Sequence, residues 1–149
     1  MGSKGYRWQS ILLVTAQMTG IVAIMATGPW LAQQPGLLLL EACGVAIGLW
    51  ALLTMRRATF SVMPDVKAGA QFVDHGPYRW IRHPMYLAVL LVTVALVSAS
   101  WTWWRLAIWA LLALAILVKI DYEERLLRAH YPIYATYRRQ TKRLLPYVF

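Results

Sequence analysis

Apolar residues gather in four runs along the 149-residue chain, and short polar segments separate these runs. Residues 10–31 contain no charge, and at about 1.5 Å per residue they cover the roughly 30 Å of a membrane's hydrocarbon core. Residues 37–55 carry a single charge, at Glu41, in the first turn of the expected helix. The pattern predicts four membrane-crossing helices, at about 10–31, 37–55, 84–102 and 104–120.

The fourth run is the shortest, because only residues 106–118 are apolar between Arg105 and Lys119. A stretch of this length is at the low end for a membrane span. We expect the helix to gain length from its flanks, since Lys119 can extend its charged end toward the interface. On the other side, three tryptophans suit the boundary between membrane and water: Trp101, Trp103 and Trp104.

Composition agrees with this pattern. Hydrophobic residues make up 60% of the chain and charged residues 14%, whereas soluble domains carry roughly 25% charged residues. One Cys and three scattered His provide no metal-site spacing, so we expect no metal. The sequence therefore predicts an all-α integral membrane protein, residues 1–149 forming a single domain whose oligomeric state stays open.

The net charge of +9 would fit a nucleic-acid partner if the basic residues covered a polar surface. Instead, 14 of the 15 Lys and Arg fall on one side of the predicted spans, and Arg105 alone falls on the other. Cytoplasmic loops carry such an excess of Lys and Arg. We therefore expect the lipid bilayer as the partner and no nucleic acid, with both termini and the loop before residue 84 in the cytoplasm.

Two polar segments flank the last two spans on this side. Residues 76–86 hold two Arg, one His, two Tyr and one Trp, and Pro84 suits the first turn of a helix whose free N–H groups attract an anion. Residues 119–149 continue the fourth helix and are expected to break near Pro132. Both segments could also serve only as interfacial anchors, with Arg at lipid phosphate and aromatic rings in the interface.

Three of the chain's six acidic residues lie within four positions, directly after the fourth span. A structural interpretation is available, because Asp121 with Arg125 and Glu124 with Arg128 are pairs spaced i, i+4 on a helix. Glu123 has no such partner, so its carboxylate is the freer one to bind a ligand. Glu41 sits where a carboxylate complements a helix dipole, which favours a structural role.

Taken together, these segments resemble the isoprenylcysteine carboxyl methyltransferase family, to which phospholipid N-methyltransferases are related. Its members carry G-x-Y-x-x-x-R-H-P-x-Y before a membrane helix, then E-E-x-x-L, Y-x-x-Y and a terminal T-x-R-x-x-P. The matching residues here are Gly76, Tyr78, Arg82, His83, Pro84, Tyr86, Glu123, Glu124, Leu127, Tyr134, Tyr137, Thr141, Arg143 and Pro146. The match covers the C-terminal half of the chain.

The resemblance implies transfer of the methyl group of S-adenosylmethionine, leaving S-adenosylhomocysteine, to a lipid or lipidated acceptor at the cytoplasmic face. It also implies a pocket built from the cytoplasmic loop and the C-terminal helical segment. The expected cofactor-binding residues are Ala70, Gln71, Phe72, Val73, Tyr78, Arg82, His83, Pro84, Met85, Tyr86 and Glu123. Lys119 and Tyr137 are expected near the acceptor, with Lys119 standing where Arg is usual.

Methyl transfer needs two aligned reactants and the exclusion of water, and few acid or base groups. A carboxylate acceptor is already ionised near pH 7, whereas a phospholipid amine must first lose a proton. Glu124 and His83 are the catalytic residues we expect for that task. Two alternatives stay open at this point. One is an NADPH-dependent sterol-type membrane reductase, because Leu145-Pro146-Tyr147 of this chain is similar to the C-terminal ending of such enzymes. The other is a non-catalytic membrane scaffold.

Overall fold

The computed structural model describes residues 3–56 and 73–145 of the chain. Within this part the regular structure is helical, and the one β-bridge joins Ile81 to Lys142. The described residues form five α-helices and one short 3-10 helix: α1 (Ser3–Ala26), α2 (Pro35–Arg56), η1 (Gly76–Arg79), α3 (Pro84–Ala99), α4 (Trp103–His130) and α5 (Tyr134–Gln140).

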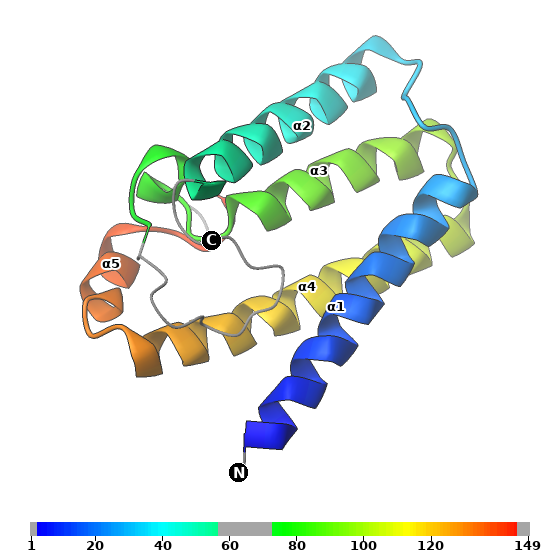
Figure 1. Ribbon diagram of the computed structural model, residues 1–149. Coiled ribbons are helices and arrows are strands. Elements are labelled where there is room, and N and C mark those ends of the chain that lie inside the picture. Colours follow the sequence, from blue (N-terminus) through cyan, green and yellow to red (C-terminus); the bar gives the residue numbers. More distant parts are fainter. Residues whose placement is uncertain (1–2, 57–72, 146–149) are drawn as a thin grey trace.

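The helices pack as two antiparallel pairs, α1 with α4 and α2 with α3, and contacts between α3 and α4 join the pairs (Figure 1). A continuous apolar core runs along this junction and includes Ile24, Leu96, Leu112, Ile116 and Ile120. Figure 1 shows α5 and η1 at the end of the bundle where α2 ends, α3 begins and α4 ends. We call this the loop end.

Three of the helices, α1, α2 and α4, are long and apolar enough to cross a membrane. The fourth, α3, is apolar but has 16 residues, about 24 Å at 1.5 Å per residue. Large apolar side chains are exposed on the outer helix faces, among them Leu39 and Leu111, as expected where lipid takes the place of water. The chain is therefore a multi-pass membrane protein, while the crossing by α3 and the sidedness stay predictions.

Two predicted helix ends were placed too late. We expected the first helix to reach residue 31, but it ends at Ala26, because Gly28 and Pro29 follow and proline cannot continue the hydrogen-bond ladder. The third ends at Ala99 and not at residue 102. The extension of the fourth helix is confirmed, since α4 runs from Trp103 to His130 and stops before Pro132.

Arg105 holds two helix ends together at the far end of the bundle. Its side chain is completely buried, and its Nη2 donates to the carbonyls of Ile24 in α1 and Leu96 in α3, at 3.1 and 3.2 Å. Its Nη1 donates to both oxygens of Ser100. A Cβ added to Gly28 would overlap the guanidinium, so that glycine makes the close packing possible. The lone cation on this side is thus a cap for α1 and α3.

Glu41 was expected in the first turn of its helix, but α2 begins at Pro35 and its first turn holds no acidic residue. Glu41 makes a structural contact of another kind. Its buried carboxylate accepts a hydrogen bond of 2.9 Å from the backbone N–H of Ala32. This contact ties the connection between α1 and α2 to the first turns of α2.

Two segments far apart in sequence run side by side at the loop end. The backbone N–H groups of Arg82 and His83 donate to the carbonyls of Lys142 and Arg143, at 2.7 and 3.1 Å. The N–H of Lys142 donates to the carbonyl of Trp80 at 3.1 Å. This short parallel ladder fixes the residues before α3 against the residues after α5.

Candidate functional site

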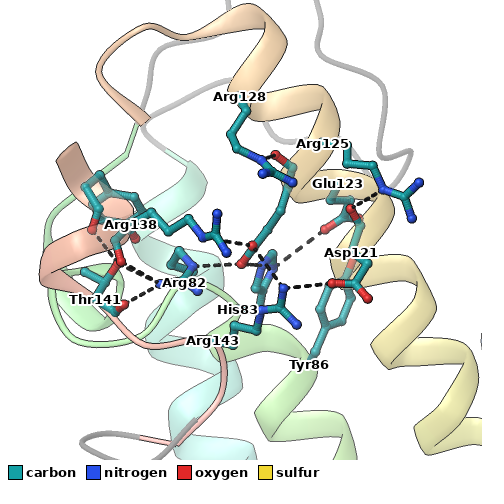
Figure 2. Close-up of polar contacts among 12 residues, drawn as sticks. Arg82, His83, Tyr86, Asp121, Glu123, Arg125, Arg128, Arg138, Thr141 and Arg143 are labelled. Atoms are coloured by element: carbon teal, nitrogen blue, oxygen red, sulfur yellow. Dashed lines mark hydrogen bonds and ion pairs between the residues drawn. The ribbon is translucent and has the colours of Figure 1, made fainter. Parts of the chain in front are cut away.

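The first feature of the loop end is an ion pair between the segment before α3 and the polar end of α4. Nε of Arg82 donates to Oε1 of Glu124 at 2.8 Å (Figure 2). The Nη1 of Arg82 donates to the carbonyls of Arg138, at 3.2 Å, and Thr141. Arg82 therefore joins α4 to the C-terminal end of α5, and these contacts occupy much of its guanidinium.

Four cationic or basic side chains surround the Glu124 carboxylate, which is 0% exposed. Besides Arg82, His83 Nε2 lies 3.5 Å from Oε1, and Arg143 and Arg138 lie 3.6 and 3.8 Å from Oε2. At 1.5 Å per residue, residues 103–122 already cover about 30 Å, so Glu124 lies beyond the membrane-crossing part of α4. Burial alone would raise its pKa, but the hydrogen bond from Arg82, the nearby His83 and the charges of both residues outweigh burial and lower the pKa to about 2.

The neighbouring carboxylate of Glu123 has a different environment. Its Oε1 accepts a hydrogen bond of 2.5 Å from the hydroxyl of Tyr86, and its Oε2 lies 3.7 Å from Nδ1 of His83 (Figure 2). The imidazole of His83 stacks on the ring of Tyr86, with centroids 5.6 Å apart. Burial raises the pKa of Glu123 above its ordinary value, although His83, Tyr86 and Lys119 oppose that shift.

Adjacent acids on α4 are therefore shifted in opposite directions. Glu124 stays ionised as part of a buried network, whereas Glu123 is the stronger base and retains a side chain that is 15% exposed. Such divergence separates a structural carboxylate from one that can exchange a proton or bind a ligand. Glu123, Tyr86 and His83 form a cluster at the start of α3 that we call the Glu123 cluster.

Lys119 lies one helical turn before Glu123 and points into the bundle. Its Nζ donates to Oε1 of Gln17 in α1 at 2.9 Å and lies 5.1 Å from the centroid of the Tyr86 ring. Only 2% of Lys119 is exposed. The ammonium is thus held between α1, α3 and α4, next to the Glu123 cluster.

Tyrosines connect η1 to α5. The hydroxyl of Tyr137 donates to the backbone carbonyl of Tyr78 at 2.6 Å, and Thr141 Oγ1 donates to the carbonyl of Tyr137 at 2.7 Å. Burial is the main cause that raises the pKa of both Tyr78 and Tyr137, so both phenols are neutral at pH 7. A cavity of about 160 Å³ lies beside Tyr137 and is lined by Asp74, Arg79, Ile133, Thr136, Tyr137, Gln140 and Thr141.

Comparison with known families decides what kind of site this is. The family model described as Phospholipid methyltransferase matches residues 35–133, which are 99 of the 149 residues. The chain belongs to the phospholipid methyltransferase family. No curated protein matches it. The family assignment confirms the resemblance to membrane methyltransferases, and it supports an enzyme over a non-catalytic scaffold.

The family match includes most of the predicted site of this methyltransferase. Within it, the structure brings His83, Pro84 and Tyr86 at the start of α3 against Glu123 and Glu124 on α4. Met85 follows Pro84 in the first turn of α3, and Val73 is half-buried before η1. Ala70, Gln71 and Phe72, expected in the cofactor pocket, lie outside the described residues, as does Pro146 of the terminal motif.

The sequence allowed Asp121 to pair with Arg125, and Glu124 with Arg128, as neighbours along the helix. This interpretation of the acidic residues is wrong. Arg125 and Arg128 donate from Nε to the backbone carbonyls of Asp121 and Glu124, at 3.3 and 3.1 Å. The carboxylate of Asp121 pairs with Arg143, whose Nη2 lies 2.8 Å from Oδ1 of Asp121. Because the carboxylates turn toward the segments around Arg82 and Arg143, tertiary pairing replaces pairing along the helix.

Sequence reasoning missed Gln17, whose side-chain oxygen accepts a hydrogen bond from Lys119 beside the Glu123 cluster. It lies outside residues 35–133, in the middle of the apolar run that forms α1, and is almost wholly buried. A long polar side chain inside a membrane span is a functional candidate in its own right. That signal was present in the sequence.

Proposed function

We propose that the protein is an S-adenosylmethionine-dependent methyltransferase that acts on a lipid or lipidated acceptor at the cytoplasmic face of the membrane. The observation that carries the proposal is the Glu123 cluster, in which the start of α3 meets the polar end of α4 in a chain of the phospholipid methyltransferase family. The one-sided distribution of Lys and Arg supports the cytoplasmic face and four crossing helices.

The residues present fit the proposed cofactor. Within the described part of the chain, Oε2 of Glu123 accepts no hydrogen bond, so it is available to an amino or hydroxyl group. When bound, the cofactor supplies a methyl group on a positively charged sulfonium. Neutral tyrosine rings such as that of Tyr78 suit a neighbouring cation, by roughly 0.5–2 kcal/mol. Tyr86, His83 and Glu123 would hold it.

We assign Arg82 and Glu124 a positioning role. Arg82 was expected to bind the cofactor, but its hydrogen bonds go to Glu124, Arg138 and Thr141. Glu124 was expected to take up a proton, but a carboxyl whose pKa is about 2 is a weak base at neutral pH. Both residues fix the backbone that presents His83 and Glu123.

For an acceptor that must lose a proton, we assign its removal to His83, whose Nδ1 lies 3.7 Å from Oε2 of Glu123, because Oε2 itself is assigned to the cofactor. A phospholipid amine requires this step, whereas a prenylcysteine-like carboxylate does not. The family description favours the phospholipid amine. Exposed apolar faces on the helices allow either acceptor to arrive from the lipid.

Radiolabelled methyl transfer tests the proposal. Purified protein in lipid nanodiscs receives S-adenosylmethionine carrying a labelled methyl group, with phosphatidylethanolamine in one arm and N-acetyl-S-farnesylcysteine in the other. We expect label in the extracted lipid of one arm, and at least a tenfold loss in Glu123→Gln. Glu41→Gln makes the same chemical change at the opposite end of the bundle and is expected to retain activity. Absence of label in both arms would overturn the proposal.

A further inference from the structure

The contact between Gln17 and Lys119 joins a helix outside the family match to the proposed site. Gln17 Oε1 accepts a hydrogen bond of 2.9 Å from Lys119 Nζ, and both side chains are buried. Its helix, α1, packs along α4 but contributes no other side-chain hydrogen bond to the described part of the loop end. The amide therefore has a specific partner.

The surroundings of Lys119 explain why an amide is needed there. A buried ammonium is costly unless it is hydrogen-bonded, and the four-carbon stem of lysine allows many positions. Gln17 supplies a carbonyl oxygen on one side and the Tyr86 ring lies 5.1 Å away on another. Together they direct the ammonium toward the face of α4 that also carries Glu123, one turn later.

The contact with Gln17 is the one hydrogen bond that Lys119 donates within the described residues. An ammonium has three N–H donors, so two remain for another acceptor of hydrogen bonds. Because the amide is neutral, it fixes the ammonium without cancelling its charge. The ammonium is left able to bind an anionic oxygen, whether of a phosphate or of a carboxylate.

We propose that Gln17 is a positioning residue for the methyl acceptor: it holds the Lys119 ammonium where an anionic oxygen of the acceptor binds, beside Tyr86 and Glu123. This inference rests on the proposed function. It makes α1 part of acceptor recognition, although that helix is outside the family match. Gln17 acts through Lys119, so removal of its amide weakens acceptor binding and leaves the cofactor-binding residues in place.

The test compares Gln17→Leu with Gln9→Leu, the same change at an exposed position of the same helix. Initial rates of methyl transfer in nanodiscs give the KM for S-adenosylmethionine and the KM for the lipid acceptor separately. For Gln17→Leu we expect the acceptor KM to rise about tenfold while the donor KM stays within twofold of wild type. Gln9→Leu is expected to match wild type in both. The phosphatidylethanolamine and farnesylcysteine arms distinguish phosphate from carboxylate as the bound anion.

Two further variants separate positioning from a loss of folding. Gln17→Glu keeps the hydrogen bond but neutralises the ammonium, so it should retain the wild-type Tm and still raise the acceptor KM. In a Lys119→Met background, Gln17→Leu should have no further effect, because the two residues act in series.

Three results would overturn the inference. One is an acceptor KM in Gln17→Leu equal to that of Gln9→Leu. Another is an equal rise of the donor and acceptor KM, and the third is an effect of Gln17→Leu that multiplies with that of Lys119→Met. Failure of the wild-type protein to methylate either lipid would instead defeat the proposed function, and this inference with it.

Discussion

Arg82, in the connection between η1 and α3, and Glu124 on α4 are 42 residues apart and form a buried ion pair in which Nε donates to Oε1 at 2.8 Å. The pair fastens the segment before α3 to the polar end of α4. Removal of one partner leaves the other buried and uncompensated, which costs about 3–5 kcal/mol. We therefore expect Glu124→Gln to lower the Tm in detergent markedly, as followed by circular dichroism.

The matched control for this change is Asp121→Asn on the same helix. Asp121 pairs with Arg143, but its side chain is 48% exposed. Exposed ion pairs contribute at most about 1 kcal/mol, so the loss of Tm should be small. Equal losses in the two variants would contradict the central place of Glu124 in the network.

The lowered pKa of Glu124 gives a pH dependence with a defined sign. Its folded-state pKa is about 2, against an ordinary value of 4.5, so the carboxylate stabilises the folded protein fully above about pH 4.5. That contribution is lost progressively as the pH falls from about 4.5 toward 2. Denaturant unfolding of wild type and Glu124→Gln should therefore show a constant difference in unfolding free energy between pH 7 and 5. The difference should shrink at lower pH, and a difference that grew there would refute the assignment.

Tyr137 tests whether the α5 tyrosine supports the pocket or contacts the acceptor. Its hydroxyl donates to the Tyr78 carbonyl at 2.6 Å, and loss of one such bond costs about 1 kcal/mol. Tyr137→Phe is expected to lower the Tm slightly and to leave the acceptor KM within twofold of wild type. A large rise in acceptor KM with no change in Tm would support the sequence-based assignment of Tyr137 to the acceptor.

Gly28 tests the packing at the far end of the bundle. A methyl group there would displace the Arg105 guanidinium from the carbonyls that it caps on α1 and α3. We expect Gly28→Ala to destabilise the protein by about 3 kcal/mol, the range for disruption of a buried charged network. Gly36→Ala is the control, because an added Cβ there meets nothing within 4 Å. The two variants should differ clearly in Tm.

Much of the site follows from local sequence. Pro84 marks the first turn of α3, and the motif residues before it could be expected to face the acids after the fourth span, because antiparallel helices bring those ends together. The pairing of individual side chains could not be predicted. Helical spacing favours Glu124 with Arg128. Instead, the guanidinium of Arg82, 42 residues away, binds this carboxylate, and the bridge between Ile81 and Lys142 holds the segment that carries Arg82.

Two polar residues within the spans show the same limit. Arg105 reads as a lone cation outside the membrane, yet it is fully buried, because the C-terminal ends of α1 and α3 meet there and their carbonyls need donors. Gln17 could be noticed as a polar residue inside a span, but its partner could not be predicted, because Lys119 is on α4, 102 residues away. Both depend on which helices pack together, a property that hydrophobic patterning leaves open.

The most direct test of the central claim is calorimetric titration of the purified protein with S-adenosylhomocysteine, with NADPH in a parallel titration. We expect saturable binding of S-adenosylhomocysteine, no binding of NADPH, and a loss of affinity of about 10-fold to 100-fold in Glu123→Gln, as for a lost hydrogen bond to a charged group. Glu41→Gln should bind like wild type. Binding of NADPH alone, binding of neither ligand, or unchanged affinity in Glu123→Gln would contradict the account.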